Sequence, residues 1–143
     1  MEIVHSKLPY FDVMSILMKG DVDFNPSLTS SLDIEQYAMK LSQYADFILL
    51  QDETETLGCI AYYKNEQERF IYISHFWVSG ILQGKGYGKL LLGKLCDMVV
   101  GTFCEIRLEV LKTNPALFFY QKQGFLSVED RGSKFLMCLL ISK

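Results

Sequence analysis

Hydrophobic residues in the first third of the chain recur every three or four positions, which is the spacing of amphipathic helices. The first such segment runs from Pro9 to Lys19, and Gly20 is suited to cap its C-terminal end. The second follows a polar loop, and Ser30 or Ser31 is expected to cap its start. Its apolar stripe predicts one buried face, made of Ile34, Tyr37, Ala38, Leu41 and Ala45. Ahead of both helices, Met1–Val4 fits a short edge strand.

The spacing changes in the middle of the chain to apolar runs divided by short polar turns. Asp46–Leu50, Thr56–Tyr63 and Arg69–Val78 have the length and composition of strands. Because the turns between them are short, we expect these three strands to pair antiparallel as a meander.

The next part of the chain predicts a strand–helix–strand unit. Gly86–Val100 has helical periodicity, and Glu105–Leu111 alternates strictly between apolar and charged residues. Together with the strand Arg69–Val78, these segments are expected to form a βαβ unit whose two strands are parallel.

The end of the chain predicts one more helix and a hairpin. Asn114-Pro115 opens the helix, with Asn114 as its cap, and Gly124 ends it. Phe125–Glu129 and Lys134–Ser142 are expected to form the closing hairpin. No repeat or linker divides the chain, so residues 1–143 are expected to form a single α/β domain.

Composition narrows the classes of function. Hydrophobic residues make up 50% of the chain and charged residues 22%, and the net charge of −3 argues against nucleic acid as the main partner. No apolar run approaches the ~18 residues of a membrane span, and the N-terminus lacks a signal-peptide pattern. The four cysteines contain no CxxC pair and the two histidines are scattered, so no metal site is expected. These features favour a cytoplasmic protein with reduced cysteines and no membrane partner.

The glycine-rich loop before the central helix has the features of a phosphate site. In Gln83-Gly84-Lys85-Gly86-Tyr87-Gly88, the glycines let the backbone turn tightly and approach a ligand. A helix that begins here points unpaired N–H groups and a positive dipole end at the loop. The loop is not a P-loop, because a glycine follows the lysine where Ser or Thr is needed, and its glycine spacing also fails the dinucleotide pattern. A flexible strand-to-helix turn is the alternative.

Two motifs in this order resemble the GNAT superfamily of acyl-CoA-dependent N-acyltransferases. Gln83, Gly86 and Gly88 match the family's Arg/Gln-x-x-Gly-x-Gly/Ala signature. The segment Leu108–Phe125, with its Leu-Glu-Val strand, Asn114, the Phe-Tyr pair and Gly-Phe, is similar to the family's second signature. The resemblance covers Asp46–Ile141. It implies a GNAT-like α/β fold with a central mixed sheet of about six or seven strands, an N-terminal antiparallel meander, a CoA-binding βαβ unit and helices on both faces.

The resemblance also implies the donor, which would be acetyl-CoA as a co-substrate without a metal. Its pyrophosphate would lie on the glycine-rich loop, and its arm would lie where the two parallel strands splay apart, pairing with strand backbone. A backbone N–H there would stabilise negative charge on the thioester oxygen. The residues implied to hold the donor are Phe76, Trp77, Val78, Gln83, Gly84, Lys85, Gly86, Tyr87, Gly88, Lys89 and Asn114.

The implied chemistry is attack of an amine on a thioester, which needs one group to accept a proton and one to donate it. Tyr120 matches the family's tyrosine and is the expected donor to the CoA sulfur. Glu109 is the leading base, acting directly or through a water, although it could instead be a structural partner of Arg107. His75 is the rival base, since histidine titrates near neutral pH.

Strand periodicity makes His75 the weaker candidate. Counting in steps of two puts His75 on the same face as Ile71, Ile73 and Trp77. The other face then carries Tyr72, Ser74 and Phe76. Many family members have Glu or His on that second face, so the presence of tyrosine and serine here leaves the base open.

The acceptor is expected to contact the N-terminal part of the chain, where family members differ most. Asp21, Asp23, Asn25 and Tyr37 are candidates by position alone, and a solvated turn explains the loop residues equally well. Phe24–Leu28 loosely resembles members linked to bacterial surface polysaccharides, which favours an amino sugar.

The expected function is therefore transfer of an acetyl group to a small-molecule primary amine by direct attack in a ternary complex. A protein N-terminal or lysine acetyltransferase is one alternative, and an acyl-CoA-binding module without turnover is another. The oligomeric state stays open, a homodimer included.

Overall fold

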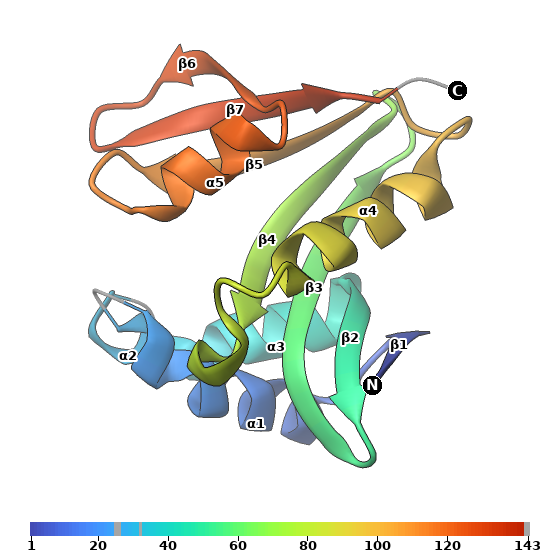
Figure 1. Cartoon of the computed structure of the whole chain (residues 1–143), viewed down its shortest axis with the longest axis vertical. Coiled ribbons are helices and arrows are strands. Elements are labelled where there is room, and N and C mark those ends of the chain that lie inside the picture. The colour runs from blue at the N-terminus through green and yellow to red at the C-terminus, as the bar shows by residue number, and fades with distance from the viewer. Residues whose placement is uncertain (25–26, 32, 142–143) are drawn as a thin grey trace.

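A seven-stranded mixed sheet forms the centre of the protein, and the computed structural model describes residues 1–24, 27–31 and 33–141 (Figure 1). The strands lie side by side in the order β1-β2-β3-β4-β5-β7-β6. Their bounds are β1 Glu2–Ser6, β2 Asp46–Asp52, β3 Glu55–Asn65, β4 Phe70–Val78, β5 Glu105–Leu111, β6 Leu126–Asp130 and β7 Lys134–Leu140. All neighbours are antiparallel except β4 and β5, which are parallel. The predicted edge strand, meander, parallel pair and closing hairpin are confirmed; Ser142 lies outside the described residues.

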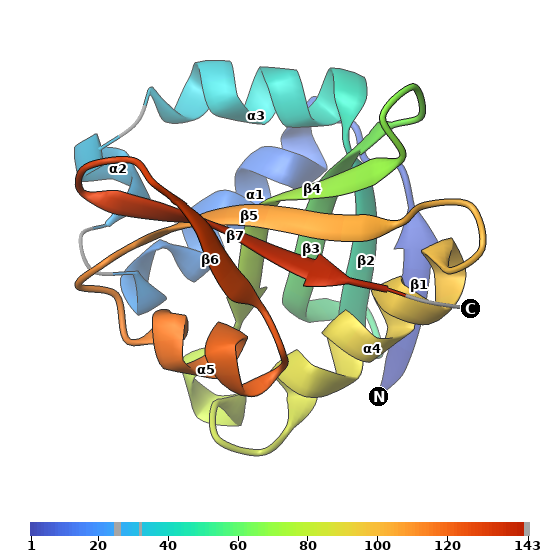
Figure 2. The same ribbon diagram turned by 90° about the horizontal axis from the view of Figure 1, so that it is seen from above.

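Helices cover both faces of the sheet, as the second view shows (Figure 2). Their bounds are α1 Tyr10–Gly20, α2 Leu28–Ser31, α3 Ile34–Tyr44, α4 Tyr87–Val99 and α5 Ala116–Lys122, with 3₁₀ turns at Asp21–Asp23 and Gly80–Leu82. We call the side covered by α1 and α3 the α3 face, and the side covered by α4 and α5 the α4 face. Each face buries its own hydrophobic core.

The two cores follow from the alternation of side chains along the strands. On the α4 face, Ile71, Leu91 and Ile106 are fully buried. On the α3 face, the predicted stripe of α3 is confirmed: Ala38 and Leu41 are fully buried.

The predicted cap of α3 is wrong. The helix begins after Asp33, whose carboxylate accepts the backbone N–H of Gln36 at 3.2 Å. Ser30 and Ser31 belong instead to the short helix α2. An aspartate directly before the first helical residue satisfies an N–H group of the first turn.

The prediction that Gly20 caps the C-terminal end of α1 is also wrong, because the cap residue is Asp21. Gly20 is the last residue of α1 and keeps right-handed helical dihedral angles. A Cβ atom at this position would lie 2.9 Å from the ring of Trp77. That ring is 3% exposed, and its Nε1 donates a hydrogen bond to Asp23 at 2.9 Å. Glycine is therefore needed here because α1 approaches β4 so closely.

A β-bulge in β4 overturns the predicted division of its side chains between the two faces. His75 pairs with Ala61 and Ile73 pairs with Tyr62, so Ser74 is an extra residue between them. The extra residue reverses the alternation. Beyond it, the side chains of His75 and Trp77 lie on the α3 face, away from Ile71 and Ile73.

Phe76 changes face for the same reason. Its side chain packs against the core of the α4 face, with Ile71 and Ile73, and not beside Tyr72 and Ser74 as strict alternation predicts. A single inserted residue thus re-aims every side chain in the second half of β4.

We expect Gly20→Ala to lower the free energy of unfolding by about 1–3 kcal/mol, because its methyl group overlaps the held ring of Trp77. Denaturant unfolding measures this change. The matched control is Gly93→Ala in α4, where an added Cβ meets nothing within 4 Å. It should raise the free energy of unfolding by roughly 0.5–1 kcal/mol. The same effect in both variants would contradict the packing role of Gly20.

Candidate active site

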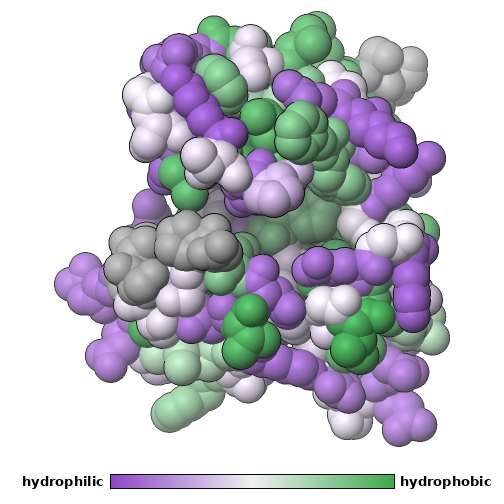
Figure 3. Space-filling view, turned by 60° about the vertical axis from the view of Figure 1, so that its left-hand side comes forward, coloured by the Kyte–Doolittle hydropathy of each residue, from purple (hydrophilic) through white to green (hydrophobic). Residues whose placement is uncertain are grey.

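A wedge opens in the sheet between the carboxyl-terminal parts of β4 and β5. The two strands pair at three positions only, the last being Tyr72 with Arg107. Beyond these, β4 keeps β3 as its neighbour and β5 keeps β7. The inner edges of the wedge therefore carry backbone N–H and C=O groups without a strand partner, which suits a ligand with amide groups of its own. Figure 3 shows the surface hollowed here, with hydrophobic residues in its depth.

The glycine-rich loop lies at the end of β4 and leads into α4. Gly84 and Gly86 have φ angles of +78° and +87°, a conformation that L side chains rarely adopt. The Gln83 side chain donates to the carbonyl of Val78 at 3.0 Å and so ties the loop to the end of the strand. Gly86 immediately precedes the 13-residue helix α4. The free N–H groups of the first turn therefore start at this loop, which is the arrangement of an anion site.

The remaining loop residues differ in exposure and contacts. Lys85 and Lys89 are exposed, and Tyr87 packs partly against the core of the α4 face. Gly88 is in the first turn of α4, where a Cβ atom would lie 3.3 Å from the ring of Phe119. This close approach joins the start of α4 to α5.

Four aromatic rings connect the loop, the wedge and α5. The Phe76 ring of β4 contacts Phe119 at 5.9 Å and Tyr120 at 6.0 Å between centroids, and Tyr120 contacts Phe125 at 5.5 Å. Edge-to-face contacts of this kind stabilise the fold by more than the burial of their surface area alone would. They hold Tyr120 against the part of β4 that borders the wedge.

Tyr120 is 9% exposed and lies in this apolar surround. Burial raises the pKa of its hydroxyl above the ordinary tyrosine value. The hydroxyl is therefore protonated at neutral pH and is available as a donor.

Asn114 and the neighbouring strand residues have clear structural contacts. The Asn114 side chain accepts the backbone N–H of Ala116 at 2.9 Å, which confirms it as the cap of α5. Val78 packs against the core of the α4 face, whereas the Trp77 side chain lies on the α3 face. Only the backbone of Trp77 is thus available to a ligand in the wedge.

Glu109 lies on the α3 face, opposite the buried side chains of β5, as predicted. Tyr72 donates to one carboxylate oxygen at 3.2 Å, and Arg131 donates to the other at 3.2 Å. The sequence offers Arg107 as an alternative, structural partner of Glu109. That prediction is wrong, because Arg107 pairs with Glu105 instead. The carboxylate is half-buried and fixed in orientation by partners on two other segments.

His75 does not lie where a general base needs to be. It is 4% exposed, with its ring between those of Phe24 and Tyr37, and its Nε2 has no hydrogen-bond partner among the described residues. Complete burial lowers its pKa to about 4. His75 is thus a neutral core residue of the α3 face at physiological pH.

Three of the four candidate acceptor residues lie in the part of the chain that the structure describes. Asp21 accepts the backbone N–H groups of Leu28 and Thr29, and Asp23 holds the indole of Trp77, so both carboxylates are structural. Asn25 lies outside the described residues. Among the described candidates, Tyr37 contacts β4 beside the wedge, through Ser74.

Three residues beside the wedge were absent from the predicted site: Tyr63, Tyr72 and Arg131. Tyr72 and Glu109 lie on the two parallel strands of the predicted βαβ unit, so their contact was foreseeable from the sequence. Arg131 gives no local signal, because its contact with Glu109 depends on how the β6–β7 hairpin pairs with β5 in the sheet.

Within the described residues, no group of three or more His, Cys, Asp or Glu side chains could hold a metal ion. No helix in the same part of the chain is long and apolar enough to cross a membrane.

Comparison with known proteins gives one family and a shared fold. The model of the family described as "Acetyltransferase (GNAT) family" matches residues 12–125. The structure is similar to the PaiA N-acetyltransferase of Thermoplasma acidophilum, determined in complex with coenzyme A, with a TM-score of 0.77, 20% identity and coverage of 98% of this chain and 99% of that one. It is also similar to the ribosomal-protein-S18-alanine N-acetyltransferase of Escherichia coli, with a TM-score of 0.74, 18% identity and coverage of 99% and 96%. No curated protein matches the sequence.

The buried state of His75 predicts a pH dependence of stability. An exposed histidine in the unfolded chain titrates near ~6.5, whereas the folded pKa is about 4. Between these values the unfolded chain binds one proton more, so the free energy of unfolding falls as the pH falls. We expect His75 to lower the free energy of unfolding by up to roughly 3 kcal/mol as the pH falls through this range.

Denaturant unfolding between about pH 7 and pH 4 measures the loss. His75→Gln should remove the part of the pH dependence of the free energy of unfolding that comes from this residue. A variant with the full slope of the wild type would contradict the assignment of a buried neutral histidine.

Proposed function

Because the family match spans most of its length, the chain belongs to the GNAT family of acetyltransferases, and we propose that it acetylates the primary amine of a small molecule. Membership makes the protein an acyltransferase whose donor is acetyl-CoA. The acceptor and the roles of individual residues are the proposal. The observation that carries it is the position of Glu109 and Tyr120, which approach the same wedge from opposite faces of the sheet.

The residues present fit the donor. The loop at Gly84 and Gly86 combines left-handed glycines with the start of a 13-residue helix, which suits a pyrophosphate. The unpaired inner edge of β4, at Phe76, Trp77 and Val78, suits the amide groups of the pantetheine arm. Lys85 and Lys89 add positive charge beside the loop, and Asn114 holds the start of α5. Bound acetyl-CoA supplies the activated acyl carbon and a thiolate leaving group.

Glu109 is the proposed proton acceptor. A primary amine is mostly protonated at neutral pH and must lose a proton before it can attack. The carboxylate attracts the ammonium group from the α3 face and takes that proton, directly or through a water. Tyr72 and Arg131 keep its two oxygens in place while it does so.

Tyr120 is the proposed proton donor, on the α4 face. As the carbon–nitrogen bond forms and the carbon–sulfur bond breaks, the departing thiolate takes the hydroxyl proton of Tyr120, and the second proton that the nitrogen loses restores the tyrosine. The raised pKa of this hydroxyl keeps it protonated, and so able to donate, at neutral pH.

The proposal has one decisive experiment. Calorimetry with acetyl-CoA tests donor binding, and thiol release across a panel of amino sugars, other small amines and peptides tests transfer. Donor binding with amine-dependent release of CoA supports it. Tight binding without release from any amine favours a binding module instead, and release only with peptides favours a protein acetyltransferase.

We expect Tyr120→Phe to lower kcat tenfold or more, because general acid catalysis contributes roughly 10²–10⁴ in rate. The KM for acetyl-CoA should change little, since the ring and its aromatic contacts remain. Tyr44→Phe, at an exposed position at the end of α3, is the control. Turnover by Tyr120→Phe at the wild-type rate would remove the residue from the mechanism.

We expect Glu109→Gln to lower kcat/KM by about 10²-fold or more, and to remove the acidic limb of the pH–rate profile. The matched control is Glu129→Gln, because Glu129 also pairs with Arg131 but lies on β6. If the acidic limb persists in Glu109→Gln, this carboxylate is not the base.

A further inference from the structure

The chain that leaves α1, residues 20–24, is attached to the half of β4 that borders the wedge. Trp77 Nε1 donates a hydrogen bond to the Asp23 carboxylate at 2.9 Å, and the ring of Phe24 lies 5.3 Å from that of His75 between centroids. His75 and Trp77 are the side chains that the bulge in β4 turns to the α3 face. One strand therefore holds residues 20–24 with its side chains and borders the wedge with its backbone.

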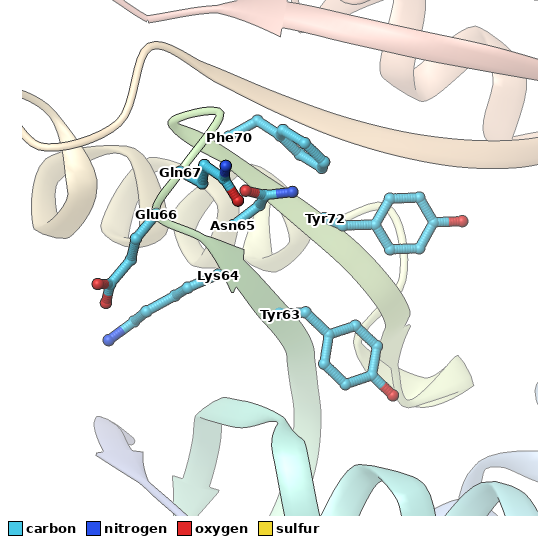
Figure 4. A pocket seen from close by; sticks show the side chains of 7 residues that line it. All are labelled: Tyr63, Lys64, Asn65, Glu66, Gln67, Phe70 and Tyr72. Carbon is cyan, nitrogen blue, oxygen red and sulfur yellow. The ribbon is translucent and has the colours of Figure 1, made fainter.

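Before the bulge, β4 faces a pocket instead. The pocket has a volume of about 480 Å³ and lies along the hairpin with β3, and Phe70 and Tyr72 line it from β4 (Figure 4). The hydrogen bond and the ring contact of residues 20–24 both fall in the other half of the strand, where its pairing with β5 has ended. The attachment thus coincides with the part of β4 that is open to a ligand.

The Asp23 carboxylate lies at the junction of α1, β4 and the approach to the glycine-rich loop. A Cβ atom at Gly80 would lie 2.6 Å from Asp23 Oδ1, so the carboxylate packs directly on the 3₁₀ turn that follows β4. On its other side, the indole of Trp77 fits against Gly20, where a Cβ atom would lie 2.9 Å from the ring. The carboxylate and the buried indole therefore have little room to move.

Acetyl transfer depends on the placement of this half of β4. In the proposed site, the donor arm pairs with the inner edge of the strand, and a backbone N–H there faces the thioester oxygen. Rates fall steeply when such groups are displaced, since a shift of about 1 Å can cost roughly 10²-fold. A hydrogen bond to a carboxylate is stronger than one between neutral groups. It suits the task of holding a strand residue in one orientation.

We propose that Asp23 is a positioning residue for acetyl transfer, which fixes the half of β4 beside the wedge through the indole of Trp77. This inference rests on the proposed place of the donor arm along β4. Asp23 touches neither the donor nor the acceptor in this role. Its loss misaligns the thioester with the attacking amine but leaves the pyrophosphate contacts of the glycine-rich loop in place. The consequence is a lower kcat with an unchanged affinity for CoA.

The test separates alignment from binding and from folding. Asp23→Leu keeps a side chain of similar size without the accepting oxygen, and it should lower kcat about tenfold or more. Calorimetry should give the wild-type Kd for CoA and the wild-type number of sites per chain. A wild-type kcat in Asp23→Leu overturns the inference. A fall in kcat matched by an equal fall in CoA sites also overturns it, because that result shows unfolding and not misalignment.

Two further variants assign the effect to the hydrogen bond. Asp23→Asn keeps an oxygen that can accept the indole N–H, so it should restore most of the kcat that Asp23→Leu loses. The matched control is Asp21→Leu, because Asp21 lies in the same 3₁₀ turn but accepts the backbone N–H groups of Leu28 and Thr29. It should keep the wild-type kcat. Equal losses in Asp21→Leu and Asp23→Leu, or no recovery in Asp23→Asn, overturn the inference.

Fluorescence tests the contact without a variant, because Trp77 is the only tryptophan of the chain. Saturating acetyl-CoA should change the emission of the wild type, since the donor arm binds along the strand that carries this indole. Asp23→Leu should start from a shifted emission maximum, because its indole has lost the hydrogen bond to the carboxylate. Wild-type emission that does not respond to acetyl-CoA overturns the inference even if Asp23→Leu does not fold.

The outcomes separate this inference from the function it rests on. Acetyl transfer by the wild type together with an unchanged kcat in Asp23→Leu overturns the inference alone. Binding of acetyl-CoA without release of CoA to any amine overturns the proposed function and the inference with it.

Discussion

The pairing of β4 with β5 stops after three residue pairs, and the arrangement of the site depends on that break. A fully paired parallel sheet would close the space between these strands and satisfy their backbone groups internally. Here β4 remains joined to β3 and β5 to β7, so each strand is held on its outer side and open on its inner side. The open edges can be satisfied by the amides of a bound ligand. The glycine-rich loop follows β4 after the short 3₁₀ turn Gly80–Leu82, and the Gln83 side chain ties it to the end of the strand.

In the proposed mechanism, the two reactants approach the wedge from opposite faces of the sheet. The aromatic cluster around Tyr120 and the start of α4 belong to the α4 face, whereas Glu109, Tyr72 and Tyr37 belong to the α3 face. The β-bulge at Ser74 contributes to this separation of side chains between the two faces. It sends Phe76 to the donor side, where it packs on Tyr120, and leaves Ser74 to bind Tyr37 on the acceptor side.

Electrostatics differ between the two sides in a way that suits an amine. On the α3 face, the groups around Glu109 are neutral hydroxyls, and burial raises the pKa values of Tyr37 and Tyr72, the latter to about 12. The neighbouring cation, Arg131, is shared with Glu129. On the other side, lysines and free N–H groups of α4 surround the loop. Negative phosphates and a positive amine are thus each met by a complementary surface.

The sequence by itself determined the order of elements, because periodicity and glycine or proline positions are local properties. It placed the meander, the parallel unit and the loop at Gly84–Gly88, and the family resemblance of its two motifs pointed to Glu109, Asn114 and Tyr120. Tertiary structure alone decided where side chains point and which groups meet. The inserted Ser74 reversed the faces of His75 and Phe76, the fit of α1 against Trp77 explained Gly20, and the folding of a distant hairpin brought Arg131 to Glu109. Such contacts join residues far apart in the chain, and short-range spacing carries no information about them.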